Sequence, residues 1–102
     1  MSATDELLYA LERAGVDRDR IHGPDRFGAY LVRRENPDGA LIFCADRARD
    51  GRFVWSWGVD ESVGPRGSAA RLRGLRISTD GAERHSNSMA AKVVEFLSKE
   101  ES

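Results

Sequence analysis

The residues of this chain with the clearest binding chemistry are three aromatic side chains that alternate within one short segment. Phe53, Trp55 and Trp57 are separated by single smaller residues, so in a β-strand they lie on the same face. An exposed face of this kind could stack nucleic-acid bases, at about 1–3 kcal/mol per base, or anchor a protein partner, because Trp is a frequent hot-spot residue. The alternative is that the three rings form the core under the helices, and the general burial of large aromatic side chains favours it.

A second group of candidate binding residues forms a short basic segment. Positions 65–76 hold Arg66, Arg71, Arg73 and Arg76 and no acidic residue, whereas the chain as a whole has a net charge of −1. Arginines at this spacing could follow a phosphate backbone, with an affinity that falls as the salt concentration rises. The competing interpretation is a solvated surface whose charges keep the domain soluble, and an isolated run of charges favours it.

Residues able to perform catalysis are few and poorly arranged. Cys44, the single cysteine, lies in the most apolar stretch, where burial raises the pKa of a thiol and makes it inert. His22 and His85 have no further ligand at metal-binding spacing. Asp60 and Glu61 are adjacent, so in a strand their carboxylates would point to opposite sides. Glycine loops that cradle phosphate and nucleophile elbows do not occur in the sequence. We therefore expect no catalytic residue, no cofactor and no metal site, and a protein that is not an enzyme.

Turn signals divide the middle of the chain into strands. Asp-Gly steps at positions 38–39, 50–51 and 80–81 predict turns, because Gly tolerates positive φ and Asp bonds to its own backbone. The apolar segments around the first two steps predict an antiparallel meander. Its three strands are expected over residues 27–35, 40–45 and 53–58.

Two helices are expected to flank this meander. Apolar residues at helical spacing predict one helix over residues 4–14, closed by Gly15, and another from about Ser88 to Lys99. The composition of residues 59–74, before the second helix, indicates a long connection.

Residues 69–79 leave two alternatives open. They could form a strand with a bulge at Gly74, or a short helix that ends at Gly74 and is followed by a strand. Leu75–Thr79 is predicted as a strand in both. The order of elements therefore predicts a single α+β domain over residues 1–102, with an N-terminal helix, a three- to four-stranded antiparallel β-meander and a C-terminal helix packed on one face of the sheet.

The composition is that of a globular protein in a reducing compartment. Hydrophobic residues make up 40% and charged residues 32% of the 102 residues, which excludes the composition typical of disorder. Neither an apolar run of membrane-spanning length nor a signal-peptide pattern is present. A single cysteine cannot form an intramolecular disulfide, so we predict a cytoplasmic location.

The functional expectation that follows is a small non-catalytic binding or accessory protein. We expect it to contact another protein, or a second copy of itself as a homodimer through an edge strand, and no membrane. The alternative is a nucleic-acid-binding module that uses the Arg66–Arg76 segment and the Trp55/Trp57 face. Fourteen of the 16 basic residues are Arg, which is typical of GC-rich coding and would suit a phage or mobile-element protein of a GC-rich bacterium.

Overall fold

The computed structural model describes residues 2–26, 28–47, 50–60 and 80–100. Two longer helices, one 3₁₀ turn and five strands lie within these ranges. In chain order they are α1 (Ala3–Arg13), the 3₁₀ turn (Arg18–Arg20), β1 (Ile21–His22), β2 (Ala29–Arg34), β3 (Gly39–Arg47), β4 (Phe53–Asp60), β5 (Gly81–Glu83) and α3 (Ser86–Ser98).

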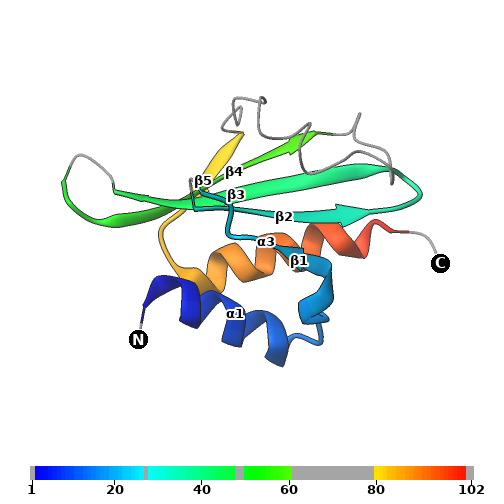
Figure 1. Ribbon diagram of the computed structural model, residues 1–102, viewed down its shortest axis with the longest axis horizontal. Coiled ribbons are helices and arrows are strands. Elements are labelled where there is room, and N and C mark those ends of the chain that lie inside the picture. The colour runs from blue at the N-terminus through cyan, green and yellow to red at the C-terminus, as the bar shows by residue number, and fades with distance from the viewer. Residues whose placement is uncertain (1, 27, 48–49, 61–79, 101–102) are drawn as a thin grey trace.

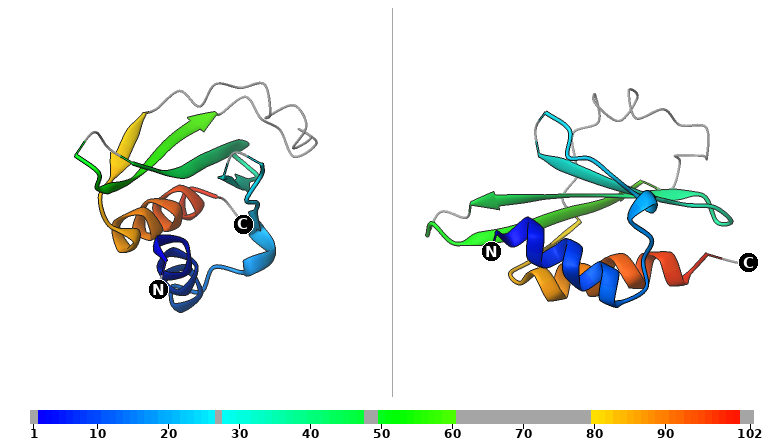
Figure 2. Two further views of the ribbon diagram at one scale, coloured as in Figure 1. Left: turned by 60° about the vertical axis from the view of Figure 1, so that its left-hand side comes forward. Right: turned by 60° about the horizontal axis from the view of Figure 1, so that its bottom comes forward.

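The strands form one antiparallel sheet in the order β1-β2-β3-β4-β5, and both helices cover the same face of it (Figure 1, Figure 2). The predicted α+β class is confirmed, with five strands where three to four were expected. β1 is an additional short strand at one edge, where Ile21 pairs with Val32. β5 lies at the other edge. The predicted strand over Leu75–Thr79 and most of the predicted connection before it lie outside the described residues.

β5 corrects the prediction of a turn at positions 80–81. Gly81 lies in the strand and pairs with Trp57. A Cβ atom at Gly81 would lie only 2.5 Å from Cζ2 of the Trp57 ring, so this position needs glycine for close approach rather than for a turn. Asp80 extends the pairing, because its N–H donates to the Trp57 carbonyl at 2.9 Å and its carboxylate accepts the Val59 N–H at 2.8 Å.

The register of the three long strands collects the large apolar residues on the face beneath the helices. Tyr30 pairs with Phe43, and Phe43 also pairs with Trp57 on the other side. The rings of Tyr30 and Phe43 stack with centroids 5.5 Å apart, and Trp55 meets Phe43 edge-on at 5.9 Å. The helices add six buried apolar side chains to this cluster: Leu7, Leu11, Met89, Ala90, Val93 and Phe96.

One serine joins both helices to the sheet. The Trp55 indole N–H donates to the Ser86 hydroxyl at 3.2 Å, and that hydroxyl donates to the Ala3 carbonyl at 2.9 Å. Ser86 opens α3 and Ala3 opens α1, so the two helices begin side by side and run in the same direction (Figure 1). The helix that was expected to start at Ser88 therefore starts two residues earlier.

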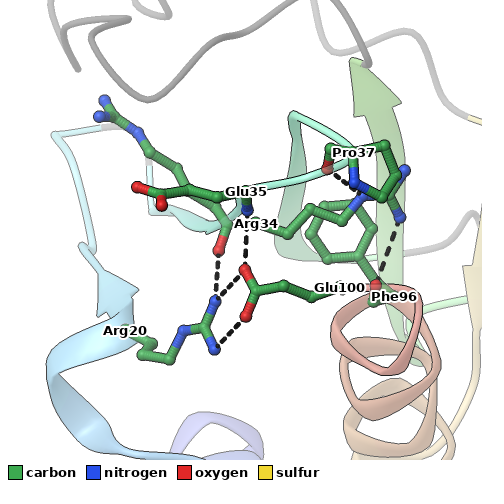
Figure 3. Close-up of polar contacts among 7 residues, drawn as sticks. Arg20, Arg34, Glu35, Pro37, Phe96 and Glu100 are labelled. Atoms are coloured by element: carbon green, nitrogen blue, oxygen red, sulfur yellow. Dashed lines mark hydrogen bonds and ion pairs between the residues drawn. The ribbon is translucent and has the colours of Figure 1, made fainter. Parts of the chain in front are cut away.

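Arg34 neutralises the opposite, C-terminal end of α3 (Figure 3). This side chain is only 5% exposed, and its guanidinium lies 4.3 Å from the centre of the Phe96 ring. It donates to the Phe96 carbonyl at 3.3 Å and to the Pro37 carbonyl at 3.1 Å. The last carbonyls of a helix carry partial negative charge, so a cation is favourable there.

Glu100 fastens the chain after α3 to the edge of β2 (Figure 3). Its carboxylate accepts two hydrogen bonds from Arg20, at 3.0 and 2.9 Å, and one from the Glu35 backbone N–H at 2.7 Å. Arg20 also donates to the Arg33 carbonyl at 3.1 Å. The hydrogen bonds from Arg20, and then the one from Glu35, hold the pKa of Glu100 below its usual 4.5.

This geometry predicts an acid-sensitive contribution to stability. A carboxyl group whose pKa is lower in the folded than in the unfolded chain stabilises the fold at pH values above the unfolded pKa. This stabilisation is lost as the pH falls through the pKa of the folded chain. Because both side chains of the Arg20–Glu100 pair are partly exposed, we expect Glu100→Gln to lower the unfolding free energy by about 1 kcal/mol or less at neutral pH. The difference from wild type should shrink toward zero as the pH falls below the usual 4.5.

Urea unfolding followed by tryptophan fluorescence at several pH values measures this difference. Glu95→Gln is the matched control, because Glu95 is also a glutamate in a partly exposed ion pair, but its partner is Lys92 within the same helix. A Glu100→Gln difference that stays constant down to the lowest pH would contradict the role of the carboxylate.

Candidate functional site

An open groove of about 810 Å³ lies at the end of the molecule where both helices begin. Three elements form its walls: α1, the start of β4, and the link between β5 and α3. The lining side chains with binding chemistry are Glu6, Tyr9, Arg13, Phe53, Arg84 and His85. Trp55 and Ser86, which are buried, contribute to the same lining.

Two exposed aromatic rings line this groove from different elements. Tyr9 of α1 is 58% exposed and Phe53 of β4 is 51% exposed. Among the large hydrophobic side chains of the described ranges, only Val94 is also exposed. The guanidinium of Arg13 lies 5.7 Å from the centre of the Tyr9 ring, and that of Arg47 lies at the same distance from Phe53. The groove therefore presents apolar rings with cations beside them.

The aromatic triplet predicted from the sequence does not form one exposed surface. Trp55 is 1% exposed and belongs to the core, because α1 and α3 cover the middle of this sheet face. Trp57 is partly buried, packs against the same core and has the Lys92 ammonium 4.6 Å from its ring centre. Of the three rings, Phe53 alone is largely exposed where it lines the groove, because the paired ends of β3 and β4 extend past the helices (Figure 1).

The four predicted arginines lie outside the described residues, so the structure assigns them no place. These are Arg66, Arg71, Arg73 and Arg76.

Sequence reasoning missed Tyr9, Arg13 and Arg84, which the fold brings together from the two ends of the chain. One signal for Tyr9 was present. The apolar stripe that predicts α1 includes Leu7 and Leu11, and Tyr9 falls on the opposite, polar face of the helix. An aromatic ring on the solvent face of an amphipathic helix is a candidate contact residue, because Tyr is frequent among the hot spots of protein interfaces.

The two helix ends at the groove differ in their capping. Ser2 precedes α1 and accepts the Asp5 N–H at 3.1 Å, and the first turn of α1 holds two acidic residues. α3 follows His85, which makes no capping hydrogen bond through its side chain, and its first turn has no acidic residue. The positive end of the α3 dipole is thus open toward the groove.

Among the residues considered for catalysis, His22, His85 and Cys44 do not converge, and Glu61 lies outside the described residues. His22 lies in β1 at one edge of the sheet, whereas His85 follows β5 at the other edge. Cys44 follows Phe43 in β3 and so points to the face away from the helices. In the part of the chain that the structure describes, no three His, Cys, Asp or Glu side chains are grouped so that they could hold a metal ion.

The Cys44 thiol is held in its protonated form. Burial raises its pKa from the ordinary 9.0 to about 11, and the negative charge of Asp46 adds to the shift. The thiol also donates a hydrogen bond to the Asp46 carboxylate at 3.5 Å. A protonated thiol is a poor nucleophile, so this cysteine has the properties of a structural residue.

Alkylation by iodoacetamide tests this assignment. In the folded protein the rate should keep rising up to about pH 11, whereas the urea-unfolded chain should level off near 9.0. Asp46→Asn removes the nearby charge and should move the folded profile to lower pH, while circular dichroism at each pH confirms that the fold persists. A folded profile with its midpoint at or below that of the unfolded chain would contradict the burial of this thiol.

Neither helix in the described ranges is long and apolar enough to cross a membrane. Comparison with protein-family models, with curated proteins and with solved structures found no match to this chain. Functional inference therefore depends on the groove and on the side chains that line it.

Proposed function

We propose that this protein acts by binding a segment of a partner protein in the groove between α1, β4 and the start of α3. The observation that carries the proposal is the pair of exposed rings, Tyr9 and Phe53, which face one groove from two elements. Aromatic side chains that flank a concave site supply most of the energy of many protein contacts. A cytoplasmic setting is part of the proposal and is in keeping with a single, protonated thiol.

The floor of the groove supports this assignment because it is already rigid. Trp55 and Ser86 are buried there and linked by a hydrogen bond. A site whose floor is fixed before binding loses little conformational entropy when a ligand arrives. The two rings at the rim can still change rotamer to fit a side chain of the partner.

Burial of Trp55 weakens the alternative of a nucleic-acid module. Base stacking needs an open ring face, and this indole is 1% exposed. Nucleic acid and a second copy of the chain are therefore treated as competing outcomes of the test.

Peptides selected from a random displayed library on the wild-type protein provide the test. We expect Tyr9→Ser and Phe53→Ser each to weaken the selected peptides about tenfold, which corresponds to about 1.4 kcal/mol for the loss of one aromatic anchor. Val94→Ser is the matched control, because Val94 is exposed on α3 and does not line the groove. Isothermal titration calorimetry measures the affinities.

Three results would contradict the proposal. The selected peptides could bind the Tyr9→Ser and Phe53→Ser variants as tightly as wild type. A mixed-sequence single-stranded oligonucleotide could bind more tightly than any selected peptide. Light scattering could show a dimer that both variants dissociate, which would make the groove a contact between two copies.

A further inference from the structure

We infer that the groove selects an acidic segment, in which carboxylate side chains flank an apolar or aromatic anchor. This inference rests on the proposed function and names the chemistry of the partner.

Two arginines line the groove and form neither an ion pair nor a side-chain hydrogen bond within the described part of the chain, although the Arg13 guanidinium lies over the Tyr9 ring. Arg13 belongs to α1 and Arg84 to the link between β5 and α3. Other arginines of the protein have acceptors of their own, as Arg20 has in the Glu100 carboxylate and Arg34 in backbone carbonyls. The guanidinium donors of the groove thus remain available for a carboxylate, which suits their forked geometry.

One acidic side chain, Glu6, lines the same groove. Two guanidinium groups against one carboxylate leave the groove with a local positive charge, although the whole chain has a net charge of −1. Glu6 also favours a peptide over a phosphate backbone. A carboxylate repels a continuous row of phosphates, whereas it can accept N–H groups from a bound main chain.

The parallel helices add to this potential. α1 and α3 begin side by side (Figure 2). The first residues of both helices line the groove, so both positive helix ends lie there. Asp5 and Glu6 offset the end of α1, but the first turn of α3 contains no acidic residue. At the far end of α3 the opposite charge is already met by Arg34. The groove end of α3 is therefore the end that lacks a counter-charge.

The rings define the remaining chemistry of the ligand. Tyr9 and Phe53 line the same groove as Arg13 and Arg84, so an apolar side chain of the ligand would contact the rings and flanking carboxylates would contact the guanidinium groups. A partner segment with both features would satisfy the apolar and the charged walls together.

Two fluorescein-labelled peptides of the same length test the inference by fluorescence anisotropy. One contains a central Phe flanked by Asp and Glu, and the other replaces every Asp by Asn and every Glu by Gln. We expect the acidic peptide to bind about tenfold more tightly at low salt, and the ratio to fall as screening increases. Arg84→Ala should weaken the acidic peptide about fivefold and leave the amide peptide unchanged.

Arg18→Ala is the matched control, because Arg18 is an exposed arginine in the 3₁₀ turn after α1, and it does not line the groove. Equal binding of the two peptides would overturn the acidic preference, and so would an equal effect of Arg84→Ala on both. Binding of the amide peptide that requires Tyr9 and Phe53 would leave the protein-binding function standing and reject only this inference. Displacement of the acidic peptide by a tighter single-stranded oligonucleotide would overturn it in favour of nucleic acid.

Discussion

The burial of the Trp55 indole is the constraint on which the arrangement of this fold depends. A large aromatic side chain contributes much apolar area to a small core, but its N–H needs an acceptor once water is excluded. The Ser86 hydroxyl oxygen accepts the hydrogen bond from the indole, and the same hydroxyl donates a hydrogen bond to the Ala3 carbonyl. Because these two residues open α3 and α1, the same hydrogen bonds that satisfy the indole bring both helix starts to one place. The groove is a consequence of that arrangement.

Parallel neighbouring helices place like partial charges together at each end of the pair. In α3 the two ends differ in whether a side chain of the chain compensates this charge. At the C-terminal end, Arg34 is buried against Phe96 and donates to its carbonyl. Glu100, held by Arg20, then closes the edge of β2. At the N-terminal end of α3, no acidic side chain of the first turn compensates the partial positive charge of the helix. The C-terminal end of α3 therefore has a counter-charge within the chain, whereas its N-terminal end has no acidic side chain in the first turn, which is the end where we propose that an anionic ligand binds.

The sequence predicted the parts of the fold that follow from periodic patterns. Helices over residues 3–13 and 86–98 match apolar stripes, and the long strands match alternation between turn signals. β1 was not predicted, because two residues are too few to show an alternating pattern. Gly81 was wrongly predicted to lie in a turn, because an Asp-Gly step indicates one. Glycine is required at this position because the ring of Trp57, which is distant in sequence, leaves no space for a Cβ atom. Such contacts are properties of the assembled sheet.

The same limit explains why the candidate site could be predicted only in part. Phe53 and Trp55 are two residues apart in one strand and therefore lie on the same face, yet Phe53 is 51% exposed and Trp55 is 1% exposed. The difference depends on how far the helices extend over the sheet, which local periodicity does not encode. It also gives the two residues complementary roles: Trp55 belongs to the rigid floor, and Phe53 stands at the rim where a ligand can reach it. For the partner binding that we propose, a groove with a fixed floor and accessible rings would need little reorganisation, so most of the contact energy would remain available for affinity.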